Sequence, residues 1–507
     1  MNSSSEGNML YRPEKERLWD TWIVPHEDKY YLFYIRVSEG GTRWDGISLA
    51  ISDDLLHWIE KGTVLVKHPE AVWLGTGMVQ KIGYRYIMNF SEERPAEHQV
   101  ICFAESYDLL NWKRLENELR PDSKYYLVDR TGTCDFVHRW DSIGIMNASL
   151  SLDPPYYGFV TASVPNELPG KTGAIGLIRS TDGINWECLP HVNKIQEYGA
   201  YEVPEYIQFE DRHYLIFSSS EYLSGRYSKK AGFVEGGCYY LVSKNALSGY
   251  VSPPGDPMII GTRNYESPCM KTVARIIRND DDILLYYQWG DLNGDGWIGV
   301  PLLLKEIFPW KLKPFYWHGT ELLKGNKLVL NVVDSFPVRE IPSDISSRVL
   351  YDIGADCIEF TNRGSADGVY CKYLSSLSLN KYDDGRVIEC TIQVDSGLGV
   401  GFIFDCNIQQ NLVYFSFRES VLKFGYIRSG WMANLSMISY TESEQFLGYS
   451  IPHRIRLLCR KFFVEVYVDD VYADGFRFSS QIDETKIGFY MDQANGTFSS
   501  MKFWQMR

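Results

Sequence analysis

The sequence predicts an all-β protein with two domains: a five-bladed β-propeller, then a C-terminal β-sandwich of jelly-roll or concanavalin-like type. Aromatic residues make up 15% of the 507 residues, a share that favours strands. Short alternating strands with a common ending recur through the first part of the chain. Beyond residue 318 the pattern changes to short strands joined by polar turns. We therefore expect a propeller over residues 10–318 and a sandwich over residues 319–507.

The propeller is predicted from a repeated unit. Three segments close alike, with an alternating strand, a Ser, an Asp turn and a Trp: "ISLAISDDLLHW", "VICFAESYDLLNW" and "IGLIRSTDGINW". An aromatic strand precedes each of them ("KYYLFYIRV", "RYIMNFSEE", "YYGFVTASV"), and a candidate innermost strand precedes that one ("WDTWIVPHE", "GTGMVQKIG", "WDSIGIMNA"). A fourth unit begins at "YEVPEYIQF" and a fifth at "NYESPCMKTVARIIR". Repeated units of four short strands are typical of propeller blades.

The sandwich is predicted from the remaining strands. "RVIECTIQVDS", "GVGFIFDC", "LVYFSFRE", "FFVEVYVDD" and "TKIGFYMD" alternate apolar and polar residues and are separated by polar turns. This is the pattern of a β-sandwich, and no convincing amphipathic helix accompanies it.

Bulk properties exclude several classes of function. With a net charge of −14, the chain offers no basic surface for a nucleic-acid backbone, so no nucleic-acid partner is expected. No apolar stretch approaches the roughly 18 residues that cross a bilayer, so no membrane partner is expected either. The N-terminus lacks a basic segment followed by an apolar one, which predicts a cytoplasmic protein. The 10 Cys are scattered singly, as reduced intracellular thiols would be.

Three carboxylates carry the functional hypothesis. Asp20 and Asp141 follow a Trp at the start of two predicted innermost strands, and Glu202 opens a third. A lone Asp there is usually a turn residue, but the repeated Trp-Asp pair favours a function. Because innermost strands surround one axis, these groups are expected to converge. Glycoside hydrolysis needs such a set: one carboxylate at the anomeric carbon, one acid with a raised pKa for the leaving oxygen, and here a third for substrate hydroxyls.

The chain resembles the five-bladed propeller glycosidases of the clan that holds glycoside hydrolase families 32 and 68, with relation to family 43. The first motif of family 32, Trp-x-Asn-Asp-Pro-Asn-Gly, resembles "LWDTW" (18–22), and its Glu-Cys-Pro-Asp motif resembles "EVPE" (202–205). Its Trp-Ser-Gly-Ser segment resembles "WLGTG" (73–77). The resemblance implies Asp20 as nucleophile, Glu202 as general acid/base, and a propeller joined to a sandwich.

The chain also departs from the family pattern. The Asn and Pro around the nucleophile are replaced, and the Arg-Asp-Pro motif of the transition-state stabiliser is absent. Its blade offers Arg139-Trp140-Asp141 instead, with Asp135 as a competitor. We favour Asp141, because it stands at the same position in its blade as Asp20.

Further residues are candidates for substrate binding. Trp19, Trp44 and Trp73 are expected to form stacking walls at the mouth of the site, although such Trp residues also serve as core. Asp45 is a candidate partner for a sugar hydroxyl or for a surface ion pair. Glu205 is a candidate for substrate binding or for a buried hydrogen bond.

These features predict an exo-acting, retaining glycoside hydrolase of furanosides, most of all β-fructofuranosides. The alternatives are an inverting family-43-like furanosidase such as an arabinofuranosidase, a fructosyltransferase, and a non-catalytic sugar-binding propeller. The expected partner is a small carbohydrate, and a homo-oligomer is left open. No His or Cys spacing typical of a metal site is present, so neither a metal nor a cofactor is expected.

Overall fold

The structure is a computed structural model, and it describes residues 10–95, 99–128, 138–146, 155–165, 171–219, 236–262, 269–279, 282–291, 296–337, 352–354, 357–361, 366–374, 385–404, 409–428, 437–445, 447–478, 482 and 486–506. The chain divides into two compact units, Met1–Tyr265 with Cys269–Pro314 and Glu266–Pro268 with Phe315–Arg507. The predicted domain boundary, between residues 318 and 319, lies a few residues beyond this division.

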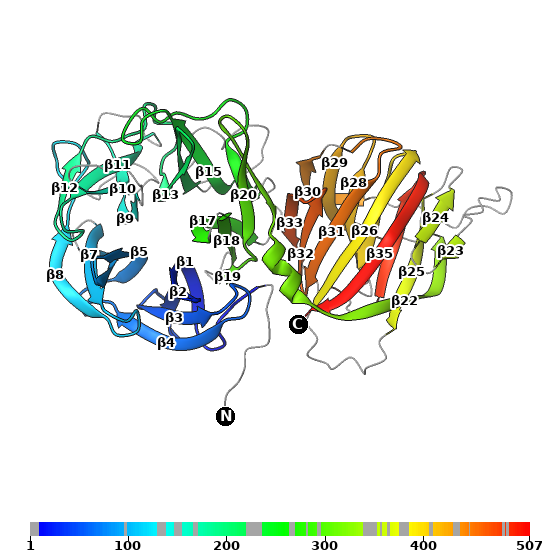
Figure 1. Cartoon of the computed structure of the whole chain (residues 1–507), viewed down its shortest axis with the longest axis horizontal. Coiled ribbons are helices and arrows are strands. Elements are labelled where there is room, and N and C mark those ends of the chain that lie inside the picture. The colour runs from blue at the N-terminus through cyan, green and yellow to red at the C-terminus, as the bar shows by residue number, and fades with distance from the viewer. Residues whose placement is uncertain are drawn as a thin grey trace. The chain divides into compact units, whose positions relative to one another are not determined.

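The first unit is a β-propeller whose blades follow one another along the chain (Figure 1). Four blades are four-stranded antiparallel sheets. The first contains β1 (Arg17–His26), β2 (Lys29–Val37), β3 (Gly46–Ser52) and β4 (Ile59–Val66), and the second contains β5 (Trp73–Ile82), β6 (Arg85–Glu93), β7 (Gln99–Ser106) and β8 (Lys113–Leu119). The third contains β9 (Trp140–Ile145), β10 (Tyr156–Ser163), β11 (Gly173–Ser180) and β12 (Trp186–Leu189), and the fourth contains β13 (Glu202–Phe209), β14 (Arg212–Ser219), β15 (Gly236–Ser243) and β16 (Met258–Thr262). The fifth blade contains β17 (Cys269–Asn279), β18 (Asp282–Asp291), β19 (Gly296–Ile298), β20 (Leu302–Phe308) and β21 (Lys311–Tyr316). Because β18 pairs with both β19 and β20, these two short strands share the third position of the blade. The prediction of a five-bladed propeller is confirmed.

Asp turns close the third strand of the first three blades, and hydrogen bonds explain their repeated sequence. In the third blade the Ser180 hydroxyl accepts a bond from the Gly183 N–H at 2.8 Å, and Asp182 Oδ1 accepts one from the Asn185 N–H at 2.8 Å. The Trp186 indole then donates to the carbonyl of Gly183 at 3.1 Å. Serine and aspartate side chains thus replace the backbone bonds that the turn lacks. The Ser and Asp contacts recur at Ser52 and Asp54 and at Ser106 and Asp108.

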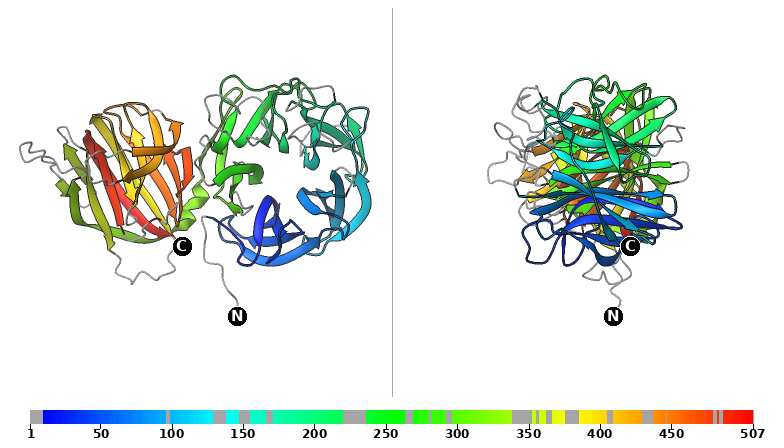
Figure 2. Two further views of the ribbon diagram at one scale, coloured as in Figure 1. Left: turned by 180° about the vertical axis from the view of Figure 1, so that it is seen from behind. Right: turned by 90° about the vertical axis from the view of Figure 1, so that its left-hand side faces the viewer.

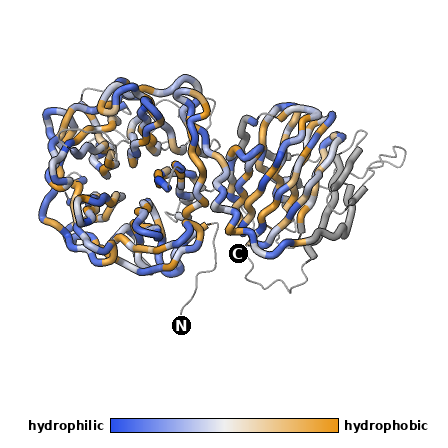
Figure 3. The backbone as a smooth tube through the Cα atoms, viewed as in Figure 1, coloured by the Kyte–Doolittle hydropathy of each residue, from blue (hydrophilic) through white to orange (hydrophobic). Residues whose placement is uncertain are grey.

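Apolar side chains pack between neighbouring blades. Trp22 and Phe33 of the first blade share one buried cluster with Leu74 and Met88 of the second. The strands alternate hydrophobic and hydrophilic residues, as Figure 3 shows. Packing on both faces holds the innermost strands rigidly, which is what a precise site requires.

The ring is closed by the N-terminal segment. Tyr11 forms an antiparallel bridge with Ile298 of β19, in which each backbone N–H donates to the other residue's carbonyl at 3.1 Å. Tyr11 is buried, and its ring lies edge-on to Tyr34 of the first blade. This segment therefore joins the fifth blade to the first.

The second unit is a sandwich of two antiparallel sheets, drawn from two further sides in Figure 2. It begins with a short 3₁₀ helix, His318–Leu323. One sheet has the order β30 (Met437–Glu444), β29 (Val421–Arg428), β28 (Gln409–Ser416), β27 (Gly399–Phe404), β34 (Lys486–Asp492), β25 (Ala366–Leu374) and β22 (Lys324–Pro337). The other has the order β33 (Val471–Arg477), β32 (Phe463–Val468), β31 (His453–Arg460), β26 (Gly385–Ser396), β35 (Asn495–Met506), β24 (Cys357–Thr361) and β23 (Asp352–Gly354).

Side chains from both sheets meet in one core. Phe402 and Phe489 of the first sheet contact Phe498 of the second, with ring centroids 5.6 Å and 5.1 Å from that of Phe498. The predicted β-sandwich is confirmed.

Candidate active site

A β-bulge interrupts the innermost strand of every blade at the same level. In each case the inner strand has one residue more than the strand beside it, which turns side chains toward the propeller axis. The extra residue falls between Trp19 and Thr21 in β1, Leu74 and Gly77 in β5, Asp141 and Ile143 in β9, Glu202 and Glu205 in β13, and Thr272 and Arg275 in β17.

Three of these bulges contain a residue with a positive φ. The angles are +38° at Ser142, +54° at Val203 and +51° at Val273. A β-branched residue in this region is strained, at a cost of order 1–3 kcal/mol, and persists only where its surroundings hold it. The strain marks the level of the propeller at which the chain is most tightly constrained.

Side chains of neighbouring blades hold the bulges. Each of three second strands supplies an oxygen that accepts a hydrogen bond from a backbone N–H in the next blade. These bonds are Asn89 Oδ1 with the Ile143 N–H (3.0 Å), Thr161 Oγ1 with the Val203 N–H (3.2 Å), and Ser218 Oγ with the Val273 N–H (2.9 Å).

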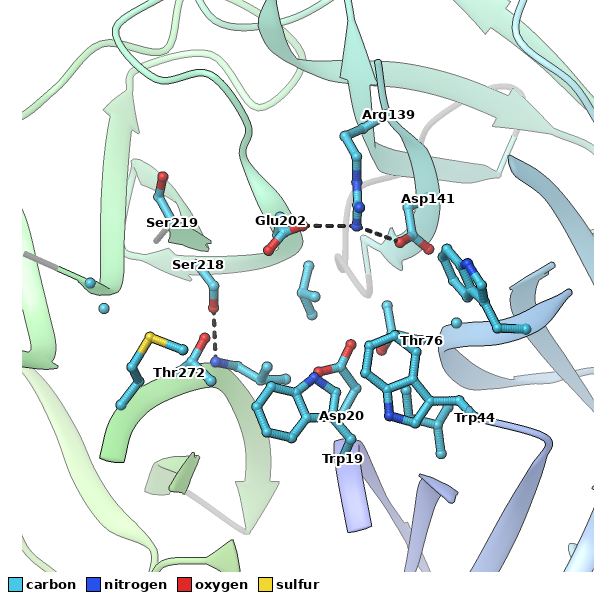
Figure 4. A pocket seen from close by; sticks show the side chains of 18 residues that line it. Trp19, Asp20, Trp44, Thr76, Arg139, Asp141, Glu202, Ser218, Ser219 and Thr272 are labelled. Carbon is cyan, nitrogen blue, oxygen red and sulfur yellow. Dashed lines mark hydrogen bonds and ion pairs between the residues drawn. The ribbon is translucent and has the colours of Figure 1, made fainter. Parts of the chain in front are cut away.

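A cavity of about 270 Å³ opens at the level of the bulges (Figure 4). Innermost strands of all five blades contribute to it. Its lining consists of Trp19, Asp20, Ile35, Trp44, Trp73, Gly75, Thr76, Arg139, Asp141, Glu202, Val203, Ser218, Ser219, Gly236, Gly237, Met270, Thr272 and Val273. The structure thus brings together the three predicted carboxylates and the three predicted tryptophans around one space.

Arg139 organises two of the carboxylates. Its Nη2 atom lies 2.8 Å from Glu202 Oε1 and 3.1 Å from Asp141 Oδ2, and Figure 4 shows it between the two groups. The Gln99 amide donates to the same Asp141 oxygen at 3.0 Å. The other oxygen, Asp141 Oδ1, is buried without a hydrogen-bond partner among the described residues and faces Gly75. A ligand hydroxyl would satisfy it.

The electrostatics of the site retain a proton near neutral pH. Burial, and after it the neighbouring Glu202 and Asp141, raise the pKa of Asp20 to about 7 against the opposing effect of Arg275 and Arg139. Burial also raises the pKa of Glu202, against the attraction of Arg139. A carboxyl group that still carries a proton near pH 7 is what acid–base chemistry on a glycosidic oxygen requires.

Aromatic rings form one wall of the cavity. Trp19 and Trp44 are stacked with centroids 6.3 Å apart, and Trp44 meets Trp73 edge-on at 5.8 Å. Trp19 also packs against Gly290 of β18, where a Cβ atom would come within 2.6 Å of the indole. The fifth blade therefore fixes the orientation of this wall.

Two predicted substrate-binding residues lie outside the cavity lining. Asp45 accepts a hydrogen bond from the Ser38 hydroxyl at 2.6 Å and lies 3.5 Å from Arg36 Nε. Glu205 is buried and pairs with Arg275 at 2.6 Å. Both carboxylates thus have partners within the protein, and their binding to substrate stays a prediction. Asp135, the competitor of Asp141, lies outside the described residues.

Some lining residues were missed by the sequence analysis. Arg139 stands two positions before Asp141, and residues two apart on a strand face the same side, so the spacing could have revealed it. Ser219 Oγ and Thr272 come from strands that looked purely structural. In the part of the chain that the structure describes, no group of three or more His, Cys, Asp and Glu is arranged to hold a metal ion. Nor do these residues include a helix long and apolar enough to cross a membrane.

Comparisons with known proteins find similarity in structure alone. Neither a protein-family model nor a curated protein sequence matches the chain. A sucrose-6-phosphate hydrolase from Lactobacillus gasseri superposes with a TM-score of 0.65 over 97% of this chain and 92% of the other, at 13% identity. A fructan 1-exohydrolase from Cichorium intybus, solved with 1-kestose, gives a TM-score of 0.63 over 100% and 98%, at 13% identity.

A glycoside hydrolase family 32 structure from Bifidobacterium adolescentis gives a TM-score of 0.64 at 11% identity, over 100% of this chain and 82% of the other. The chain therefore has the fold of family 32 structures, and the resemblance noted in its motifs extends over propeller and sandwich.

Proposed function

We propose that the chain is a glycoside hydrolase that removes terminal furanosyl residues, most of all β-fructofuranosyl residues, with retention of configuration. The observation that carries the proposal is the set of Asp20, Asp141 and Glu202 around one cavity, each at a bulge of a different blade. Family 32 structures of the same fold include proteins titled as fructofuranosidases and as a fructan exohydrolase. Fold alone does not give function, so the proposal rests on the site.

In the first step, an oxygen of Asp20 forms a bond to the anomeric carbon while the glycosidic C–O bond breaks. Glu202 gives its proton to the leaving oxygen, so the aglycone departs as an alcohol. In the second step, Glu202 removes a proton from water, the water oxygen bonds to the anomeric carbon, and Asp20 leaves as a carboxylate. The sugar is released as the free hemiketal or hemiacetal, and Glu202 again holds a proton.

These roles require the proton to lie on Glu202, since Asp20 must be ionised to attack. The pKa of Asp20, raised to about 7, sets the pH above which its ionised form predominates. Once Asp20 is covalently bound, its negative charge is gone, and Arg139 at 2.8 Å favours the ionised form of Glu202. Glu202 then serves as the base for the second step.

The size of the cavity supports attack on a terminal residue. About 270 Å³ is below the roughly 300–1,000 Å³ that is usual for larger ligands, and it suits a single sugar ring. The unpartnered Asp141 Oδ1 is placed to accept a bond from a ring hydroxyl, and such a bond would strengthen as positive charge develops in the transition state.

The proposal is tested with a panel of aryl furanosides, sucrose and fructans. We expect hydrolysis of β-fructofuranosides by the wild-type chain, and losses of at least about 10³-fold in kcat/KM for Asp20→Ala and Glu202→Gln, because each loses a group that acts in the transition state. An aryl leaving group needs little protonation, so Glu202→Gln should lose less on an aryl fructoside than on sucrose. Asp53→Asn is the matched control and should retain activity, because Asp53 is an exposed partner of Lys29 outside the cavity lining. An Asp20→Ala variant as active as the wild type would refute the proposal.

The products distinguish the alternatives. Retention predicts the β-anomer as the first product seen by NMR, whereas an inverting furanosidase would release the α-anomer. A transferase would yield longer oligosaccharides at high substrate concentration. A sugar-binding propeller without activity would bind fructosides and leave every member of the panel intact.

A further inference from the structure

Arg275 is a buried charge that the proposed reaction does not use. It lies in β17, near the propeller axis, and only 1% of its surface is exposed. Burying a guanidinium is costly unless its donors are satisfied and its charge is balanced. The groups that contact the guanidinium therefore indicate its role in the structure.

The guanidinium donates to three other blades. Nη1 lies 2.6 Å from Glu205 Oε1 in β13, and Nη2 lies 2.8 Å from the carbonyl of Gly77 in β5. Nη2 also approaches Thr76 Oγ1 at 3.2 Å, and Nε approaches the carbonyl of Thr21 in β1 at 3.3 Å. The planar fork of an arginine allows one side chain to meet several fixed acceptors at once.

Four of these residues occupy equivalent places in their blades. Thr21, Gly77, Glu205 and Arg275 are each the residue at which pairing resumes after the bulge of the innermost strand. One guanidinium thus fixes four of the bulges at the propeller axis. A change at Arg275 would shift the strands that carry Asp20 and Glu202.

Arg275 stands directly behind the candidate site rather than inside it. With Glu205 it lines a second cavity, of about 510 Å³, which shares no lining residue with the first. Its partner Thr76 and its near neighbour Val273 line the candidate site. The ion pair therefore lies between the two cavities.

We propose that Arg275, paired with Glu205, is a positioning residue that sets the geometry of four of the five bulges and, as a neighbouring cation, favours the ionised form of Asp20. The consequence of this inference for catalysis rests on the proposed function, whereas the effect of Arg275 on the ionisation of Asp20 is independent of it. The charged groups that face Asp20 are Glu202, Asp141, Arg139 and Arg275. Since Arg139 already bridges Glu202 and Asp141, Arg275 is the remaining cation acting on Asp20.

The test titrates Asp20 directly in the full-length protein. Carboxyl-labelled [¹³C]Asp gives one NMR signal per aspartate, and the signal lost in Asp20→Asn is that of Asp20. Arg275→Met should raise its titration midpoint by about one pH unit, because an opposite charge nearby lowers a carboxyl pKa by 1–3 units. Arg275→Lys should restore most of the shift. Glu205→Gln, which leaves the guanidinium in place without its counter-charge, should lower the midpoint.

Activity gives the second readout. With an aryl β-fructofuranoside, the acidic limb of the kcat/KM profile should move upward with the Asp20 midpoint, so that Arg275→Met loses about tenfold at pH 6. Arg275→Lys should keep the acidic limb of the profile at its wild-type pH, because the positive charge remains. Its kcat should be reduced, because a single ammonium group cannot donate to the acceptors of four bulges as the planar guanidinium does.

The matched control is Arg212→Met. Arg212 of β14 also joins two blades by an ion pair, with Glu306 of β20 at 2.6 Å, but it lies outside the cavity lining. The Arg212→Met substitution should lower the melting temperature and leave the titration midpoint of Asp20 unchanged. The inference would be overturned if the Asp20 midpoint of folded Arg275→Met equals that of the wild type. If Arg275→Met does not fold, an unchanged midpoint in Glu205→Gln would overturn it instead. An equal shift in Arg212→Met would also overturn it. Absence of turnover in the wild type would count against the proposed function, and the titration would still decide the role of Arg275.

Discussion

The buried position of Asp20 makes the ionised form of its carboxyl group unfavourable. Burial, Glu202 and Asp141 together raise its pKa to about 7, from an ordinary value of 3.8. Between pH 4 and pH 7 the folded protein therefore keeps a proton that the unfolded chain releases. By linkage, the stability that this group contributes is fully present below about pH 4 and is lost as the pH rises through 7. The residue that the proposed reaction depends on weakens the fold at neutral pH.

Asp20→Asn should remove this penalty. The variant is expected to be more stable than the wild type at pH 8, by on the order of 4 kcal/mol, and about equally stable at pH 4, where both side chains are largely uncharged in the folded protein. Melting temperatures at the two pH values measure the difference. The same gap at both values would show that packing, not charge, separates the two proteins.

At the scale of the strand, the bulges explain which parts of the site the sequence could predict. Asp20 and Asp141 were found because a Trp precedes each at the start of a predicted strand. The bulges themselves have no sequence signature, since Val203 and Val273 stand at positive φ against their own preference for extended backbone. Glu205 was a candidate for substrate binding or for a buried hydrogen bond, and the structure shows it paired with Arg275 just after the bulge.

The Asp turns are elements whose stability should depend on acid. Hydrogen bonds from backbone N–H groups offset the burial of Asp182 and lower its pKa to about 2. The stability that it contributes is thus present above about pH 4 and is lost as the pH falls through 2.

Asp182→Ala is expected to lower the stability of the protein by about 1 kcal/mol at pH 7, because the N–H groups of Ile184 and Asn185 lose their acceptor. Asp182→Asn retains an oxygen at this position and should lose less. Thermal unfolding at pH 7 and at pH 2.5 measures both variants. A deficit of Asp182→Ala that does not shrink at pH 2.5 would contradict the assignment of the effect to the carboxylate.

For the whole molecule, the repeated blade ending predicted more than any single residue could. Trp58, Trp112 and Trp186 each follow an Asp turn, and that regularity located the first three blades and the order of their strands. Contacts between segments that are distant in sequence have no comparable repeated motif. Neither the contact of Arg139 with Glu202 nor the Arg275 fork has a local pattern, because each joins segments that only the closed ring brings together.

Closure of the ring should be a large part of propeller stability. Tyr11→Ala removes a buried ring, and a loss of about 3 kcal/mol or more is expected from the cavity that it leaves. Tyr84→Ala, where 80% of the side chain is exposed, is the matched control and should change little. Calorimetry of both variants measures the effect. Equal melting temperatures for the wild type and Tyr11→Ala would mean that the buried ring of Tyr11 contributes little to the closure.

The same bridge has a consequence for biosynthesis. At 5–20 residues per second, the ribosome delivers Ile298 roughly 15 to 60 seconds after Tyr11. Throughout that interval the strand that carries Asp20 has no fifth blade beside it, so the proposed nucleophile belongs to the first blade made and is enclosed only when the last blade is complete. Stalled nascent chains that end before and after residue 298 should therefore differ sharply in protease resistance, and equal resistance would show that the blades become ordered before the ring is complete.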